Sequence, residues 1–211
     1  MQYPIVLKEF EKELRLYIPN PLLIKPTYEK LLLENPTILF PYWAKVWPSA
    51  IAMSIFLQQH QDLINNKTVV EIGAGIGLPS FSIADHVAEI TITDYDMNAI
   101  DLLQKNIAHI GNQKIKAIYA DWNCFPTTIC SDVVLLSDTN YDPSAFQPLL
   151  KLIQQFLEKG TTVVIATPER ITASPFIEQL ALHINQKAFI EVTHNCETAV
   201  IGLFVLKQNR K

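Results

Sequence analysis

A glycine-rich turn is the part of the sequence best suited to approach a ligand closely. The stretch Glu71-Ile72-Gly73-Ala74-Gly75-Ile76-Gly77 follows a run of apolar residues and precedes a helical pattern. Gly73 and Gly75 permit positive φ and close contact between the backbone and a ligand. The spacing is G-x-G-x-G, whereas a dinucleotide fingerprint requires G-x-G-x-x-G facing a pyrophosphate. With Glu71 beside it, this turn favours a ligand without phosphates that carries positive charge.

A carboxylate closes the next predicted strand. Asp94 follows Gly73 by 21 residues. Because the first two strands of such a sheet lie side by side at its switch point, a carboxylate here can accept both hydroxyls of a ribose. The alternative role is the N-cap of the following helix, which either Asp94 or Asp96 can supply. A nucleoside with a positive centre and no diphosphate describes S-adenosylmethionine.

Polar and aromatic residues follow the third and fourth predicted strands. Asp121 is placed to accept the adenine amino group, and the Trp122 indole to stack on its ring. The segment from Ser137 to Tyr141 follows the fourth strand, and it contains Asp138. Ligands of such sheets bind outside the carboxyl ends of the strands, so a substrate would meet the cofactor here. The alternative for Asp138 is an ordinary turn residue.

These residues require a framework of strands and helices, and the hydrophobic pattern predicts one. A helix begins at Pro48, and later helices are expected at 78–86, 100–110, 146–157 and 177–184. Buried strands are expected at 68–72, 89–93, 115–119, 132–136 and 161–166. Alternating strands and helices of this kind form a doubly wound parallel sheet.

The end of the chain breaks this alternation. Strands predicted at 189–193 and 198–206 are separated by only four residues. A parallel crossover needs a dozen or more, so these two strands must form an antiparallel hairpin. We therefore predict an α/β fold, with a Rossmann-like seven-stranded mixed sheet, helices on both faces and a C-terminal antiparallel hairpin. Residues 1–211 are expected to form one domain, with an irregular N-terminal extension (1–46) and a cofactor-binding core (47–211). Within the extension, a half-buried strand is expected at 13–18 and a short helix at 28–34.

The composition excludes several classes of protein. The chain has 49% hydrophobic and 18% charged residues, which excludes a disordered chain. Its net charge of −4 argues against a broad nucleic-acid surface. No membrane span or secretory signal is expected. Three cysteines and five scattered histidines indicate reduced thiols in a cytoplasm and no metal site. Asn98 and Asn106 are expected on the solvated face of their helix.

Two groups of motifs resemble known methyltransferases. The stretch Gly73 to Gly77, together with Asp94, resembles the class I, seven-β-strand methyltransferases. The string Pro41-Tyr42-Trp43-Ala44-Lys45-Val46-Trp47-Pro48, with Asp121-Trp122 and Asp138-x-x-Tyr141, is similar to methyltransferase family 16. The members of that family are largely protein-lysine methyltransferases. The resemblance covers roughly residues 41–206.

The resemblance implies a role for each matching position. S-adenosylmethionine is expected as cofactor, a protein lysine as acceptor and a monomer as the functional state. Asp138 and Tyr141 would position the substrate and carry out catalysis. Cofactor contacts are implied for Trp47, Gly73, Ala74, Gly75, Asp94, Trp122 and Ser137, beside those that residue chemistry suggests for Glu71 and Asp121. The alternative for Trp43 and Trp47 is a place in the core.

Other functions remain open at this level. A small-molecule amine could replace the lysine, and a non-catalytic nucleoside-binding module is the less favoured alternative. Enzymes that methylate bases in nucleic acids commonly carry Asn-Pro-Pro-Tyr where this chain has Asp138-Thr139-Asn140-Tyr141. The glycine spacing and the terminal hairpin argue against a nicotinamide-dependent oxidoreductase.

Overall fold

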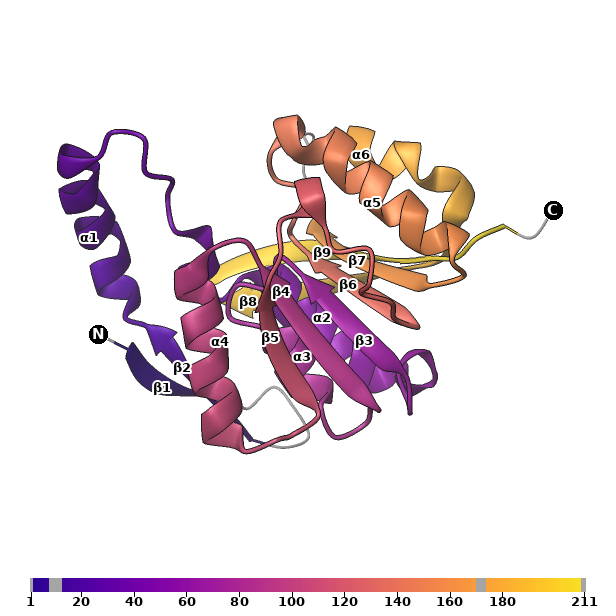
Figure 1. The fold of residues 1–211 in the computed structure, drawn as a ribbon, viewed down its shortest axis with the longest axis horizontal. Coiled ribbons are helices and arrows are strands. Elements are labelled where there is room, and N and C mark those ends of the chain that lie inside the picture. The colour runs from indigo at the N-terminus through magenta and orange to yellow at the C-terminus, as the bar shows by residue number, and fades with distance from the viewer. Residues whose placement is uncertain (1, 8–12, 170–173, 210–211) are drawn as a thin grey trace.

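The computed structural model describes residues 2–7, 13–169 and 174–209 (Figure 1). Its main sheet has seven strands in the order β5-β4-β3-β6-β7-β9-β8. Five neighbouring strands are parallel, and β9 pairs antiparallel with both β7 and β8. The strands are β3 (Thr68–Ile72), β4 (Glu89–Asp94), β5 (Ile115–Tyr119), β6 (Val133–Ser137), β7 (Thr162–Pro168), β8 (Ile184–His194) and β9 (Glu197–Leu206). The predicted seven-stranded mixed sheet is therefore confirmed.

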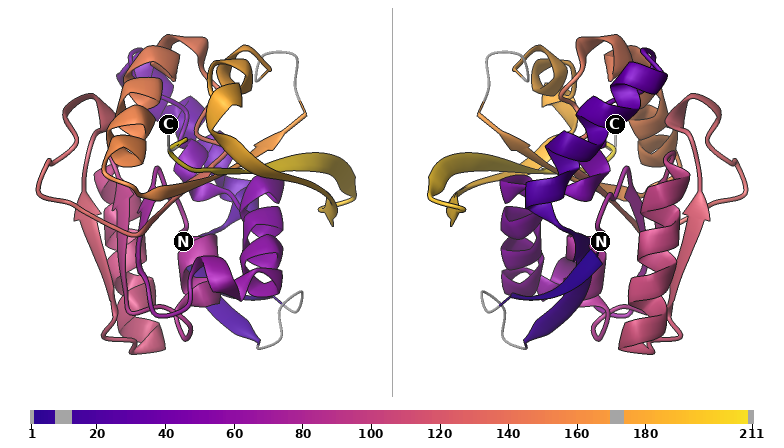
Figure 2. Two further views of the ribbon diagram at one scale, coloured as in Figure 1. Left: turned by 90° about the vertical axis from the view of Figure 1, so that its right-hand side faces the viewer. Right: turned by 90° about the vertical axis from the view of Figure 1, so that its left-hand side faces the viewer.

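Helices cover both faces of this sheet (Figure 2). Alternate residues of each strand face opposite ways, so Val69 packs in one apolar core and Val70 in the other. The first core includes α2 (Pro48–Gln59), α3 (Leu78–Ile83) and α4 (Met97–Ile110). The second lies beneath α5 (Phe146–Glu158) and α6 (Ser174–Gln179). In the described part of the chain, no helix is long and apolar enough to cross a membrane.

The N-terminal segment is more regular than its sequence suggests. Strands β1 (Gln2–Leu7) and β2 (Leu14–Pro19) form a separate antiparallel pair, and α1 (Pro21–Glu34) follows. Helix α1 begins at Pro21 behind the Asn20 cap and contains Pro26, and Ile24 is its one buried residue. The strand expected at 13–18 is thus confirmed, whereas the helix is twice as long as predicted. Its weak amphipathic pattern concealed it, because α1 contributes little to the core.

A buried asparagine joins this N-terminal segment to the sheet domain. The Asn106 amide nitrogen donates to the Tyr17 carbonyl (3.0 Å), and the Tyr17 amide donates to Asn106 Oδ1 (2.7 Å). Asn106 is fully buried in α4, so its predicted position on a solvated face is wrong. The reason is that β2 covers this face of α4, where Leu16 and Ile18 join the core.

The C-terminal hairpin turns tightly at Asn195 and Cys196. Their φ values of 51° and 64° are those of a type I′ turn, whose twist suits a two-residue hairpin loop. The helix predicted at 177–184 is only partly correct, because α6 ends at Gln179 and Ile184 begins β8. Pairing of Ile184 with Leu206 of β9 overrides the local helical spacing.

Replacing Asn106 with alanine tests this connection. Asn106→Ala leaves the amide and carbonyl of Tyr17 without their side-chain partner. We expect the free energy of unfolding, measured by urea denaturation, to fall by about 1–3 kcal/mol. The control is Asn98→Ala, on the exposed side of the same helix, which should cost less than about 0.5 kcal/mol. Equal losses in the two variants would contradict the role of Asn106.

Candidate functional site

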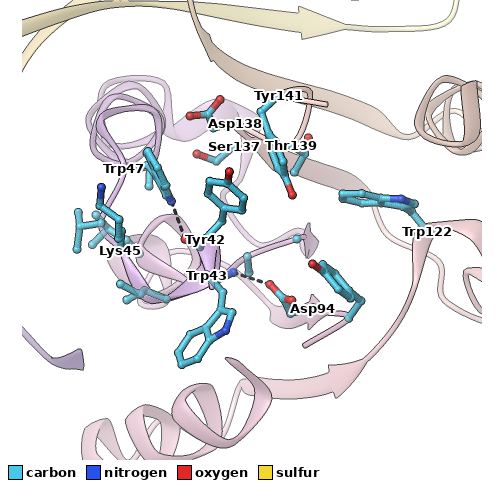
Figure 3. Close-up of a pocket in the computed structure, with 18 residues that line it drawn as sticks. Tyr42, Trp43, Lys45, Trp47, Asp94, Trp122, Ser137, Asp138, Thr139 and Tyr141 are labelled. Atoms are coloured by element: carbon cyan, nitrogen blue, oxygen red, sulfur yellow. Dashed lines mark hydrogen bonds between the residues drawn. The ribbon is translucent and has the colours of Figure 1, made fainter. Parts of the chain in front are cut away.

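A cavity of about 290 Å³ opens at the carboxyl ends of β3, β4 and β6 (Figure 3). The chain runs from β3 outward to β5 and returns to β6, so this is the switch point of the sheet. Residues 42–50, here termed the covering segment, form its opposite wall. The lining residues are Tyr42, Trp43, Lys45, Val46, Trp47, Ala50, Gly73, Ala74, Gly75, Ile76, Leu78, Asp94, Tyr95, Trp122, Ser137, Asp138, Thr139 and Tyr141.

The glycine turn lets the covering segment lie directly against the sheet edge. Gly75 has a φ of 55°, which a residue with a side chain rarely adopts. A Cβ atom at this position would lie 3.0 Å from the carbonyl oxygen of Trp43 and 3.2 Å from its Cα. Backbone cannot yield as a flexible side chain can. The absence of a side chain at Gly75 therefore allows the Trp43 backbone to approach the turn this closely.

Asp94 fixes the shape of this turn. Its Oδ2 accepts a hydrogen bond from the Gly75 amide (2.8 Å), and its Oδ1 accepts one from the Asp96 amide (2.9 Å). Burial raises the pKa of the Asp94 carboxyl, against the opposing effect of these hydrogen bonds. Asp96, not Asp94, is the N-cap of α4, since it accepts from the Asn98 amide. Each carboxylate oxygen of Asp94 can accept a further bond, and Asp94 lines the cavity.

Asp138 and Tyr141 meet the cavity from the end of β6. Asp138 has a φ of 52°, and its amide donates to the Ala166 carbonyl of β7 (2.8 Å). A non-glycine residue in this conformation is strained, and such residues cluster at functional sites. The Tyr141 ring lies 5.1 Å from that of Tyr42. Burial raises the pKa of Tyr141 to about 12, so its hydroxyl stays protonated at neutral pH.

The covering segment contributes the predicted Trp47 and two further aromatic rings, Tyr42 and Trp43, which were not predicted as site residues. The Trp47 indole donates to the Tyr42 carbonyl (2.9 Å), and Lys45 Nζ lies 4.8 Å from the centre of the Trp47 ring. Figure 3 shows Tyr42 between Trp47 and Tyr141. Trp43 lines the cavity and also packs against the first apolar core, so the alternative of a place in the core is partly confirmed. The sequence signal for these rings was the Pro41-to-Pro48 string itself, which contains Tyr42, Trp43 and Trp47.

Most of the predicted site residues are brought together. Of the predicted cofactor contacts, seven line the cavity: Trp47, Gly73, Ala74, Gly75, Asp94, Trp122 and Ser137. Ser137 Oγ and Thr139 Oγ1 are buried with no hydrogen-bond partner among the described residues. These two hydroxyls and the Asp94 carboxylate offer unused polar groups to a nucleoside and its amino-acid portion. This chemistry fits S-adenosylmethionine, and the individual contacts stay predictions.

Glu71 lies behind the cavity and not on its wall. It is 1% exposed, and its Oε2 accepts from both the Ser80 amide (3.0 Å) and the Ser80 hydroxyl (2.5 Å). Ser80 lies in the first turn of α3, where amides have no partner within the helix. The geometry thus assigns Glu71 to fastening α3 to β3, and gives no support to a direct cofactor contact. Burial raises the pKa of Glu71 to about 7.

Asp121 is also absent from the cavity wall. Its Oδ1 accepts from the Asn123 amide (2.8 Å), so it caps the short turn that carries Trp122. The carboxylate therefore holds Trp122 in place, and its predicted contact with adenine is not supported by this geometry. In the described ranges, no group of three metal-binding side chains exists.

Comparison with protein families gives one match that spans most of the chain. The family model described as lysine methyltransferase matches residues 34–193. This range includes every residue of the covering segment, the glycine turn and the strand ends that line the cavity.

The names of individual relatives refer to different acceptor nitrogen atoms. The histidine protein methyltransferase 1 homolog of Dictyostelium discoideum is 30% identical over 66% of this chain and 48% of its own length. The protein N-terminal and lysine N-methyltransferase efm7 of Schizosaccharomyces pombe is 28% identical, over 72% of this chain and 62% of its own. The rat histone-arginine methyltransferase METTL23 is 25% identical, over 58% and 57%. The chain therefore spans about half to three fifths of the length of these relatives.

A solved structure confirms the fold. The N-methyltransferase NodS from Bradyrhizobium japonicum, in complex with S-adenosyl-L-homocysteine, superimposes with a TM-score of 0.62. The match covers 84% of this chain and 97% of NodS, at 16% sequence identity. At this identity the likeness establishes the Rossmann-like architecture.

The raised pKa of Glu71 predicts how stability depends on pH. The native state retains this proton up to a pKa of about 7, whereas the ordinary pKa of a glutamate is 4.5. The native state thus binds more protons between these values, so its free energy of unfolding should fall as pH rises through this range. Glu71→Gln keeps an oxygen for Ser80 and should remove this contribution to the slope. Urea denaturation between about pH 5 and about pH 8 measures the slope, and identical slopes in both proteins would contradict the assignment.

Proposed function

This chain belongs to the lysine methyltransferase family, and we propose that it transfers a methyl group from S-adenosylmethionine to a lysine amine of a protein. One observation carries the proposal. A single cavity joins the glycine turn and Asp94 on one side to Asp138 and Tyr141 on the other. The first pair suits the nucleoside of a cofactor, and the second suits a nitrogen acceptor.

The bound cofactor would supply an activated methyl group on a positively charged sulfur. The acceptor nitrogen uses its lone pair to form the new N–C bond while the C–S bond breaks, and the nitrogen's proton is lost to water. An in-line displacement of this kind requires alignment more than acid or base catalysis. The residues of this chain must therefore hold the amine, expose its lone pair and exclude water.

Asp138 is the residue best placed to hold the amine. Its carboxylate accepts hydrogen bonds from a nitrogen donor, and Asp138 is one of the residues that line the cavity. Tyr141 is a hydrogen-bond donor or an aromatic face, and not a base, because its pKa is about 12. Together with Tyr42 and Trp47, it forms an aromatic surface beside Asp138 that suits the positively charged methyl centre.

The environment also favours the reactive form of a lysine. A free lysine amine has a pKa of about 10.4, so it is mostly protonated and unreactive at neutral pH. Burial among aromatic rings disfavours the charged form and lowers that pKa. We propose lysine over arginine on this ground, since a guanidinium stays charged in such a site.

We extend the proposal to the state and location of the protein. The described cysteines Cys124, Cys130 and Cys196 are free and exposed, which suits a reducing compartment such as the cytoplasm. We also propose a monomer, the state that the resemblance to methyltransferase family 16 implies. Sedimentation of the purified protein tests the oligomeric state.

The first prediction concerns the cofactor side of the cavity. Asp94→Asn removes the charge that would accept the ribose hydroxyls, and we expect S-adenosylmethionine affinity to fall by roughly 10- to 100-fold. Isothermal titration calorimetry measures this affinity. The matched control is Asp96→Asn, since asparagine caps a helix as well as aspartate does. If Asp94→Asn binds the cofactor as tightly as the wild type, Asp94 does not hold the ribose.

The second prediction concerns the acceptor side. Asp138→Asn retains a residue that tolerates positive φ but removes the negative charge. We expect kcat to fall by about 100-fold or more, with cofactor affinity unchanged. The assay follows labelled methyl transfer into three peptide libraries that differ only in a central lysine, arginine or histidine.

Two controls accompany this assay. Asp142→Asn alters an exposed carboxylate in the same loop, which caps a short turn by accepting from Ser144, and it should retain wild-type turnover. Free amines without a peptide test the small-molecule alternative. Preferential labelling of arginine or histidine would contradict the lysine acceptor, and full activity of Asp138→Asn would remove Asp138 from the mechanism.

A further inference from the structure

A second and larger cavity lies beside the first, between α1 and the start of α4. This α1 groove has a volume of about 570 Å³. Leu23, Leu31, Leu39 and Met97 line it, although 40–70% of each side chain's surface is exposed. Asp96 is the one charged residue among those that line the groove in the described part of the chain, and it is engaged as the cap of α4. Such a concentration of exposed apolar residues marks a binding surface.

The groove is continuous with the candidate active site. Trp43 and Tyr95 line both cavities. A row of aromatic rings also runs from one to the other, in the order Tyr141, Tyr42, Phe40 and Tyr28. Each ring centre lies 5.1 Å from the next. This aromatic row begins beside Asp138 and ends in the groove, so it forms an apolar path away from the point of methyl transfer.

The two cavities differ in their relation to the family. The walls of the first cavity lie entirely within residues 34–193, which the family model matches. The groove is bounded on one side by α1, at residues 21–34, which almost wholly precedes that range. The chemistry thus belongs to the shared part of the chain, whereas the groove is built with a segment outside it. A wall formed by a segment outside the shared part of the chain is suited to determining which substrate binds.

We propose that the α1 groove binds an apolar stretch of the protein substrate that flanks the methylated residue. This inference rests on the proposed function, because it assumes a side chain of a polypeptide as acceptor. With the acceptor amine at Asp138, the flanking chain follows the aromatic row into the groove. At about 3.3 Å per residue of extended chain, about four to six residues span the row. A bulky apolar side chain at that separation would fill the groove.

The charges near the path from the active site to the groove also favour an apolar peptide segment. Asp94, Asp96 and Asp138 carry the carboxylates near the path, and they disfavour acidic residues in a bound peptide. The groove itself contributes aromatic and aliphatic side chains. A segment with an apolar residue on one side of the acceptor, and without neighbouring acids, fits both features.

A positional peptide library tests the inference. Each peptide carries a central lysine with about six residues on either side, and one position at a time is leucine, aspartate or serine. Transfer of labelled methyl gives kcat/KM for each peptide. We expect leucine to be favoured about four to six positions from the lysine, on one side only, and aspartate to be disfavoured there.

Variants assign this preference to the groove. Leu31→Asp places a charge in the groove, and it should lower kcat/KM for the favoured peptides by about tenfold or more. Leu33→Asp is the matched control, since Leu33 lies in the same turn of α1, is 87% exposed and does not line the groove. Met97→Asp places a charge on the opposite wall of the groove and should lower kcat/KM as Leu31→Asp does. The variant should fold, because an aspartate is favourable in the first turn of a helix such as α4.

The outcomes separate this inference from the proposed function. Lysine methylation with no positional preference, or equal effects of Leu31→Asp and Leu33→Asp, would overturn the groove and leave the methyltransferase intact. Transfer to free amines but to no peptide would overturn both. A loss of self-association in Leu31→Asp, with the peptide preference unchanged, would show that the groove binds a second copy of the chain and would overturn the inference.

Discussion

The hydrogen bond between the Asp94 carboxylate and the Gly75 amide joins the two strand ends on which the site is built. This bond of 2.8 Å is buried, and the same carboxylate also accepts from the Asp96 amide at the start of α4. The glycine turn after β3 and the loop after β4 are thus held in one arrangement. Gly75 then allows the Trp43 backbone to lie against the turn, which brings the covering segment over the sheet edge. The cavity exists because these contacts occur together.

Much of the fold could be predicted because its signals are local or forced by geometry. The predicted gap of four residues before the last strand cannot hold a parallel crossover, so the hairpin followed from counting residues, although the loop in the structure is only two residues long. The strand ends were placed well enough to bring Asp94, Asp138 and Tyr141 to one edge. Helix α1 and the burial of Asn106 could not be predicted in the same way. Both depend on how the N-terminal segment packs on α4, and a contact across 89 residues has no local signature.

The roles of single acidic residues were harder to predict than their positions. Glu71, Asp94 and Asp121 all lie near strand ends, yet only Asp94 reaches the cavity. Glu71 instead accepts a hydrogen bond from the Ser80 amide at the start of α3, and Asp121 caps the turn that carries Trp122. A helix or turn N-terminus with unpartnered amides competes with a ligand for each carboxylate. Sequence spacing cannot decide that competition, because it depends on where each side chain points.

We propose that the cofactor's nucleoside binds at Asp94, the acceptor nitrogen at Asp138 and the substrate chain in the α1 groove. A crystal structure of the protein with S-adenosylhomocysteine tests this division most directly. We expect both ribose hydroxyls within about 3.2 Å of the Asp94 carboxylate, and the sulfur directed toward Asp138 and Tyr141. A nucleoside bound in the α1 groove, or a sulfur directed away from Asp138, would contradict this division.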